Sequence, residues 1–292
     1  PIAGVSQGDF EPARLIVTPK QNSMVTAGIA YRINRKFTIT SEFSTSHNDI
    51  NTFSQINNED NNAFGNNTKL VGTFNFGRDT VPAWQFITNN EFEYRTRNFN
   101  PIERYRSVEF DRDWNVRGRN YVGDELLVNL GGTLRNKQFG SFGLEAQNFT
   151  LGRDYQGNRA RFTGDWNKNG FRAKWEGSYL RSSAENQNNY TRHVADISKE
   201  FKFFKIGFKD DHELNSFLVG DSALTTNSYQ WYDWQLYLRQ LDTVKNGFNI
   251  FYRERYDRIS NTEGLAPAAT ARSVGASYDW LTSSHSKLNA LV

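Results

Sequence analysis

Residues that could carry out chemistry are few and scattered in this sequence. The four histidines, at positions 47, 193, 212 and 285, stand alone, and none belongs to an H-E-x-x-H motif. The chain has no G-x-S-x-G nucleophile elbow, no glycine-rich phosphate loop and no cysteine. A Ser–His pair would still be enough for one class of hydrolase. We nevertheless expect no catalytic residue, no enzymatic activity and no cofactor.

Oxygen ligands for a metal gather between residues 48 and 67, where asparagine, aspartate and serine are frequent. Ca²⁺ prefers such oxygens. However, the segment lacks the ordered D-x-D-x-D-G spacing of a built calcium loop. We therefore interpret it as a solvated surface loop and expect no metal site.

A denser group of charges occupies residues 103–115, with the sequence ERYRSVEFDRDWN. One interpretation is a folded lid, or a contact surface for cargo or a partner, anchored by a tryptophan and an arginine as protein interfaces often are. The other, which we favour, is a loop that orders itself through a network of arginine–carboxylate pairs. The residues in question are Arg104, Arg106, Glu109, Asp111, Arg112, Asp113 and Trp114.

The elements that carry these residues alternate with a period of two. In residues 125–135, Leu126, Val128 and Leu130 fall on one face while Asn129 and Thr133 fall on the other. The polar turn NKQFG then leads to a second alternating run at 141–151, and a five-residue turn containing glycine is typical of a β-hairpin.

The same pattern recurs along the chain and predicts about fourteen strands from residue 24 onward, with 14–18 as a further candidate. Turns of a few residues alternate with longer polar loops, which we expect at 47–67, 97–122, 153–158, 182–189, 210–227 and 258–270. This alternation places the short turns at one end of the strands and the long loops at the other, which indicates an up-and-down meander. In a Greek-key sandwich, short and long connections occur at both ends. The fold class predicted is therefore all-β, an antiparallel up-and-down transmembrane β-barrel. A large soluble β-sandwich or an extended solenoid is the alternative.

Composition agrees with this reading. Aromatic residues make up 15% of the chain although the hydrophobic total is only 37%, and Trp231, Tyr232 and Trp234 fit an interfacial girdle better than a platform for stacked bases. No run approaches the roughly 18 apolar residues of a membrane-spanning helix. A net charge of +3 is too small to indicate nucleic-acid binding.

The polar face of the strands would line the interior of such a barrel. The lumen-facing candidates are Glu42, Asn75, Glu91, Glu176, Asp233 and Arg253. We expect a pore or a protein-translocation or transport channel in the bacterial outer membrane, with membrane lipid and possible protein cargo or accessory subunits as partners and no nucleic acid. The alternative function is a structural or adhesive surface protein whose barrel anchors long extracellular loops.

Residues 1–292 are expected to form a single barrel segment belonging to a longer polypeptide, because neither end resembles a finished closing strand. Each open edge would expose unpaired backbone groups to lipid, at several kcal/mol per group. We therefore expect that strands outside this sequence pair with both edges.

Two stretches carry a resemblance: SQGDFEPARLIVTPKQNSMVTAGIAYRINRKFTITSEFSTSHNDINTFS and ERYRSVEFDRDWN. They resemble large outer-membrane β-barrel proteins of Bacteroidota and, more distantly, the very large barrel SprA, the translocon of type 9 secretion linked to gliding motility. The resemblance implies an outer-membrane location, a barrel wider than these residues can close, and a role in moving or displaying large cargo.

Overall fold

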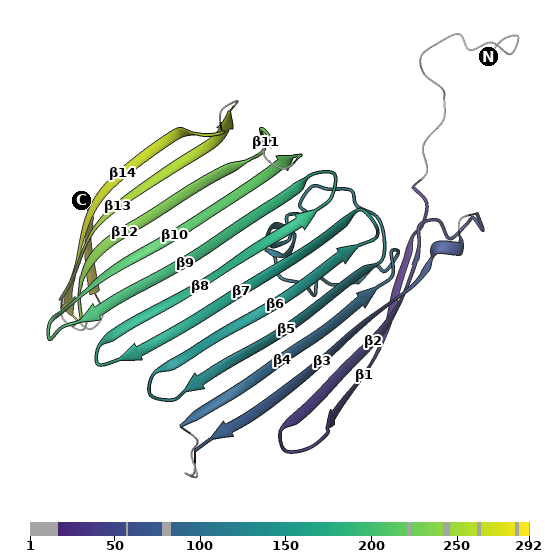
Figure 1. Ribbon diagram of the computed structural model, residues 1–292, viewed down its shortest axis with the longest axis horizontal. Coiled ribbons are helices and arrows are strands. Elements are labelled where there is room, and N and C mark those ends of the chain that lie inside the picture. Colours follow the sequence, from purple (N-terminus) through teal and green to yellow (C-terminus); the bar gives the residue numbers. More distant parts are fainter. Residues whose placement is uncertain are drawn as a thin grey trace, which may run out of the picture.

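The computed structural model describes residues 17–56, 58–77, 83–220, 223–241, 246–261, 264–283 and 286–291. These residues form one antiparallel sheet whose strands lie side by side in chain order, except that the short β11 pairs only with β10 (Figure 1). The strands are β1 (Gln21–Arg32), β2 (Phe37–Asp49), β3 (Asn62–Phe76), β4 (Trp84–Arg95), β5 (Glu125–Asn136), β6 (Gly140–Leu151), β7 (Tyr155–Lys168), β8 (Phe171–Ser183), β9 (Gln187–Glu200), β10 (Phe204–Val219), β11 (Ala223–Leu224), β12 (Tyr229–Gln240), β13 (Asn246–Asn261), β14 (Gly264–Ser283) and β15 (Ser286–Leu291).

Two short helices interrupt the connections: η2 (Asn58–Asp60) and α1 (Phe110–Asp113). No helix in the described part of the chain is long and apolar enough to cross a membrane. The all-β, antiparallel, up-and-down prediction is confirmed. The candidate strand at 14–18 and the turns at 78–83, 242–246 and 283–286 lie partly outside the described residues.

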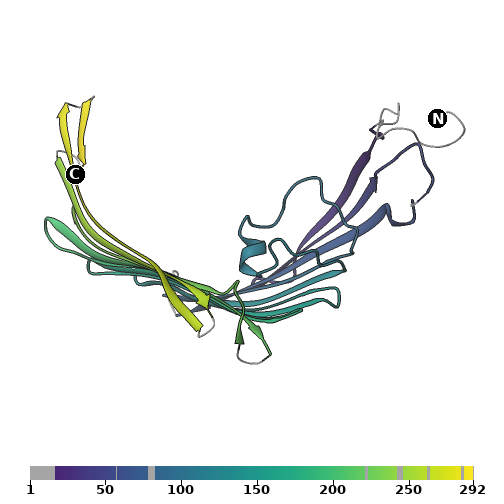
Figure 2. The same cartoon turned by 90° about the horizontal axis from the view of Figure 1, so that it is seen from above.

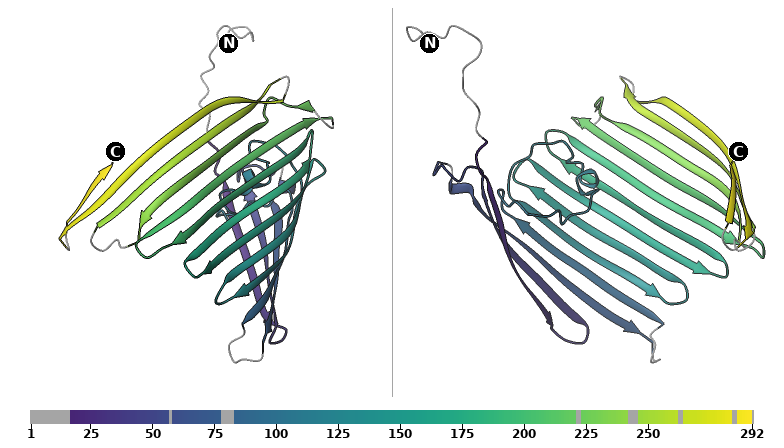
Figure 3. Two further views of the ribbon diagram at one scale, coloured as in Figure 1. Left: turned by 60° about the vertical axis from the view of Figure 1, so that its left-hand side comes forward. Right: turned by 180° about the vertical axis from the view of Figure 1, so that it is seen from behind.

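The sheet is open and curved. Within the described residues β1 and β15 form its two edges, and no ladder joins them. Figure 2 shows the sheet bent into a trough, with α1 and its loop inside the concavity, and the right half of Figure 3 shows the same loop in front of the sheet. Closure into a barrel is thus not seen in this part of the chain.

The register assigns every side chain to one of two faces. Leu130 of β5 stands opposite Ala146 of β6 and Asn90 of β4, while Asn129 stands opposite Gln147 and Glu91. The residues that share a face with Leu130 on successive strands form the convex face of the sheet. Those that share a face with Asn129 form the concave face. No second layer covers the convex face among the described residues, so its apolar side chains stay exposed: Leu130 is 58% exposed and Leu144 55%.

Four of the predicted loops are wrong in length. β7 begins at Tyr155, β8 and β9 are separated only by residues 184–186, and β13 and β14 continue to within two residues of each other. β10 likewise extends to Val219, well into the loop expected at 210–227. Polar composition suggested loops there, but an antiparallel neighbour supplies backbone hydrogen bonds whatever the side chains are. Among the described residues, the long connections that remain at the upper end of Figure 1 are 50–61, 96–124 and, interrupted by β11, 220–228.

A loop docked on the concave face

The longest connection, residues 96–124 between β4 and β5, lies against the concave face and is called the docked loop below (Figure 2). Its centre is the single turn of α1, closed by hydrogen bonds from Asp113 N to Glu109 O (2.8 Å) and from Trp114 N to Phe110 O (3.0 Å). Asn115 then adopts a positive φ of 56°, a conformation that asparagine tolerates well. This reversal points the chain back toward β5.

An apolar anchor holds the middle of the loop. Trp114 is only 2% exposed, and its ring centroid lies 5.3 Å from that of Phe149 on β6. The hydroxyl of Tyr155 on β7 donates a hydrogen bond to the carbonyl oxygen of Trp114 (2.5 Å). Leu180 and Tyr190, both fully buried, complete the cluster from β8 and β9. The main apolar core of the molecule is thus the contact between this loop and the sheet.

A charged anchor holds the first half of the loop. Arg106 pairs with Glu93 of β4 and, at 2.5 Å, with Glu125 of β5, while Arg95 pairs with Glu125 as well. The side chains of Arg106, Glu93 and Glu125 are 12%, 8% and 10% exposed. Two guanidinium groups thus balance two carboxylates at a largely dry contact. The guanidinium of Arg106 also lies 4.2 Å from the ring centroid of Phe110.

A tyrosine completes the charged anchor. The hydroxyl of Tyr105 donates to Glu93 at 3.0 Å. Partial shielding from water at this contact raises the pKa of the half-exposed Tyr105 to about 12, so the hydroxyl stays a donor even above its ordinary pKa. Glu93 is therefore bound by two residues of the docked loop.

Further contacts carry the loop across the sheet. Asp113 pairs with Arg159 of β7 at 2.9 Å, and Asn115 exchanges hydrogen bonds with Asn215 of β10 at 3.2–3.3 Å. The guanidinium of Arg119 lies 5.6 Å from the ring centroid of Phe217, also on β10. The loop therefore spans the concave face from β4 to β10.

The seven loop residues singled out in the sequence divide into three groups. Arg106 and Asp113 pair with the strands, and Trp114 is buried, so in this conformation an external partner cannot reach its ring. Arg112 pairs with Glu109 at 3.0 Å, and Arg104 donates to the carbonyl oxygens of Ser107 and Val108, so these three order the loop itself. The backbone carbonyl of Asp111 accepts from Val116 N at 2.8 Å. Pairing within the loop thus explains only part of its order.

The six lumen-facing candidates all share the concave face by register. Most lie beside a partner on a neighbouring strand. Glu91 is 3.1 Å from Lys69, Asp233 accepts from Arg253 at 2.8 Å, and Glu176 is 3.8 Å from Arg161. Asn75 accepts from Gln85 at 2.9 Å, and Glu42 is exposed. The face therefore presents mixed, largely paired charge to the concavity.

Between the docked loop and β2–β4 the concave face keeps a groove of about 870 Å³. Acidic residues such as Glu42 and Glu103 line it together with the basic residues Lys69 and Arg104. Within the described residues, no group of three or more His, Cys, Asp or Glu side chains is placed to hold a metal ion. The chemistry that this face offers is hydration and ion pairing.

Comparison with protein-family models finds no match to this chain, and comparison with curated proteins finds none either. The resemblance to outer-membrane barrels therefore stays an expectation. Any functional conclusion has to come from the geometry of the two faces and the docked loop.

The strand residues that receive the loop were not among those predicted from the sequence. Among them are the carboxylates Glu93 and Glu125, and the apolar groups Phe149, Tyr155 and Leu180. A signal for the apolar group was present, because these residues occupy the polar phase of their strands, near the long-loop end. Apolar side chains out of phase with the alternation mark a place where something covers the polar face.

Proposed function

We propose that this chain forms part of the wall of an outer-membrane β-barrel, whose polar concave face lines a pore or a transport or protein-translocation channel narrowed by the docked loop. One observation carries the proposal. The sheet is apolar on its convex side and charged on its concave side, and its longest connection folds onto the charged side. Residues outside the described sheet, from the same chain or another subunit, would complete the barrel.

The dimensions of the convex face support a bilayer-facing role. On β5 the apolar positions run from Leu126 to Leu134, roughly 27 Å along the strand and about 20 Å along the normal of a bilayer crossed at about 40°. Barrels in outer membranes carry an apolar band of about 25 Å. An exposed apolar patch that extends across the sheet is otherwise rare on a soluble monomer.

Aromatic side chains border this band. At the short-turn end, the rings of Trp84, Phe139 and Trp166 follow one another at centroid distances of 6.3 and 5.5 Å, with the Lys168 ammonium 4.2 Å from the centroid of Phe139. At the other end, Phe64 lies between Phe43 and Tyr94 at 5.9 and 5.8 Å. Two aromatic girdles flanking an apolar band are typical of outer-membrane barrels.

The docked loop favours a channel over a surface anchor. A barrel that displays loops to the outside would project its longest connection away from the sheet. Here that connection turns inward and is held by buried charge and by Trp114. A loop folded into the lumen restricts passage, and its anchors determine how firmly.

Single-cysteine labelling tests the assignment of faces, because the chain contains no cysteine of its own. Glu176→Cys on the concave face and Trp175→Cys on the convex face are neighbours in sequence and form a matched pair. In membranes containing the full-length protein, we expect a membrane-impermeant maleimide to label the first and a lipid-soluble maleimide to label both. Equal labelling of the two by the impermeant reagent would exclude a lipid-facing convex surface.

Conductance tests the channel itself. The full-length protein in a planar bilayer should conduct, and the current should rise when the docked loop is released. Absence of conductance both with the loop docked and with it released would favour the alternative, a barrel that only anchors surface loops. Release of the intact protein from membranes by carbonate or urea would refute the barrel altogether.

A further inference from the structure

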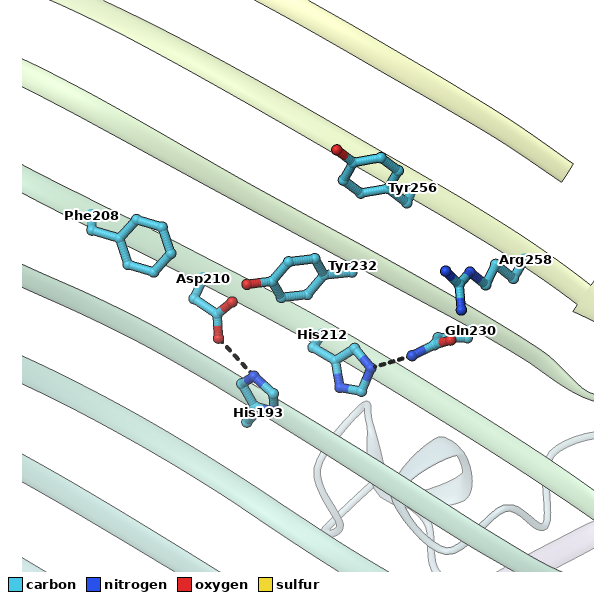
Figure 4. A pocket seen from close by; sticks show the side chains of 8 residues that line it. All are labelled: His193, Phe208, Asp210, His212, Gln230, Tyr232, Tyr256 and Arg258. Carbon is cyan, nitrogen blue, oxygen red and sulfur yellow. Dashed lines mark hydrogen bonds and ion pairs between the residues drawn. The ribbon is translucent and has the colours of Figure 1, made fainter. Parts of the chain in front are cut away.

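A polar cluster interrupts the convex face on β9, β10, β12 and β13, toward the long-loop end (Figure 4). Its members, called the convex cluster below, are His193, Asp210, His212, Gln230, Tyr232, Tyr256 and Arg258. Register places His193 opposite His212, and His212 opposite Tyr232, so they point to the same side as the apolar residues. The view that the histidines stand alone is therefore wrong for this pair.

The side chains of the convex cluster surround a hollow of about 660 Å³. His193 Nε2 lies 2.6 Å from Asp210 Oδ2, and the rings of His193 and His212 are 4.9 Å apart between centroids. Gln230 Nε2 lies 2.9 Å from His212 Nε2, whereas His212 Nδ1 is buried without a hydrogen-bond partner. Asp210 is thus already engaged by His193.

Arg258 contributes a positive charge to the convex cluster. Its side chain is exposed and lies beside Gln230 at the rim of the hollow (Figure 4). Among the described residues no carboxylate comes within ion-pair distance of Arg258. The hollow therefore offers one guanidinium without a carboxylate partner among the described residues, several neutral hydrogen-bonding groups, and the Asp210 carboxylate, which His193 engages.

The convex cluster occupies a definite level on the sheet. Nearest the short turns, Ile206, Leu238 and Ile250 continue the apolar band. Above them the rings of Phe208, Trp234 and Tyr252 form a row, with centroid distances of 6.3 and 5.4 Å. The cluster comes next. Along the strands the convex face thus presents apolar side chains, then aromatic rings, then polar groups with one guanidinium. A bilayer leaflet presents acyl chains, interface and headgroups in the same order.

We propose that the convex cluster binds the phosphate-bearing headgroup of a lipid in the outer leaflet, because the long loops of outer-membrane barrels are extracellular; this inference rests on the proposed barrel. A guanidinium matches phosphate in charge and hydrogen-bonding geometry. His212 and Gln230 supply further polar groups around it, while the hydroxyl of Tyr232 is engaged by Asp210. The occupant is a lipid and not a dissolved anion, because the hollow opens on the face whose lower part is covered by acyl chains.

Native mass spectrometry of the full-length protein in detergent tests this site, with bisphosphorylated lipid A and phosphate-free lipid A as probes. We expect tighter binding of the phosphorylated lipid, and about tenfold or greater loss of that binding in Arg258→Gln, since a charge-assisted hydrogen bond disappears. Arg255→Gln is the matched control, because it removes the same charge from the same strand on the opposite face. It should bind lipid A like the wild type.

Three results would overturn the proposal: equal binding of the two lipids by the wild type, unchanged binding by Arg258→Gln, or displacement of lipid A by millimolar inorganic phosphate. The last would assign the site to a free anion. Whether the protein inserts as a barrel is tested separately, by measuring protease protection of the wild type in lipid vesicles. A protein that inserts normally but does not distinguish the lipids would refute only the headgroup site.

Discussion

Replacing Arg106 with methionine tests whether buried charge pairing holds the docked loop in place. Arg106 bridges Glu93 and Glu125 where all three side chains are at most 12% exposed. In Arg106→Met, Glu125 keeps its pair with Arg95, but Glu93 retains only the hydroxyl of Tyr105. One carboxylate charge is then buried without compensation. Removing one partner of such a pair costs about 3–5 kcal/mol.

That cost falls on the docked state, because undocking exposes Glu93 to water. The equilibrium between docked and undocked loop should therefore shift toward the undocked form by about two orders of magnitude or more. Adding Glu93→Gln to Arg106→Met removes the stranded charge and should restore most of the docking. The double-mutant cycle then isolates the coupling between the two side chains.

Trypsin digestion of the protein in lipid vesicles measures this equilibrium, since Arg104, Arg112, Arg117 and Arg119 remain as cleavage sites in the variant. Cleavage follows the open population when opening and closing are fast. We expect cleavage about a hundredfold faster in Arg106→Met, with the double variant close to wild type and conductance changing in parallel. An unchanged cleavage rate in Arg106→Met, or equal rates in the single and double variants, would refute the reasoning.

Three further predictions follow from the faces, the glycines and the loop end. Leu130→Arg on the convex face should destabilise the inserted protein by about 2–4 kcal/mol, whereas Asn129→Arg on the concave face should be tolerated; equal damage in urea titrations of vesicle-bound protein would mean that both faces are packed. Gly177→Val would place a Cβ 2.2 Å from the ring of Phe162 and should cost about 1–3 kcal/mol of unfolding free energy, while Gly28→Val, whose Cβ would meet only a carbonyl oxygen at 3.8 Å, should stay near wild type in the same titration. Hydrogen bonds from the Tyr94 hydroxyl and the Arg97 amide lower the pKa of Asp124, so its stabilisation of the loop end is present above the ordinary carboxyl pKa of about 3.9 and lost as the pH falls through the lowered value. In the wild type, hydrogen exchange of the Arg97 amide, corrected for intrinsic rates, should accelerate only as the pH falls through the lowered pKa of Asp124. The Asp124→Asn substitution should abolish that pH dependence.

The positions of most strands could be predicted from local sequence, because apolar and polar residues alternate along a strand whose two faces meet different environments. The hairpin expected at 125–135 and 141–151 appears as β5 and β6 with almost the same bounds, and its register follows from the tight turn between them. Leu130 and Asn129 accordingly point to opposite faces. The alternation shows only which face of the sheet is apolar and which is polar. Closure depends instead on pairing between the first and last strands, which the alternation does not determine.

Upper strand ends were harder to locate because the alternation fades there. In β9 the convex positions toward the upper end are His193, Thr191 and Asn189, so the alternation is weak there, and the sequence predicted a loop up to residue 189. The backbone nevertheless continues its ladder to Gln187 because β8 and β10 supply partners. The docked loop is harder still, since Arg106 is 13 residues from Glu93 and 19 from Glu125, with no periodic pattern to connect them.

The histidine pair shows where more could have been drawn from the sequence. β9 and β10 form a hairpin whose turn is centred between Lys202 and Phe203, and His193 lies nine residues before Lys202 while His212 lies nine residues after Phe203. Residues equidistant from the centre of a tight antiparallel turn stand opposite each other and point to the same face. The apolar phase of the same strands, carried by Ile197 and Phe208, has the same parity as the two histidines. Turn position and alternation together therefore predict two imidazoles side by side on the convex face. Because only the turn and the phase enter that deduction, it would hold whether the sheet closes within this chain or with strands from elsewhere.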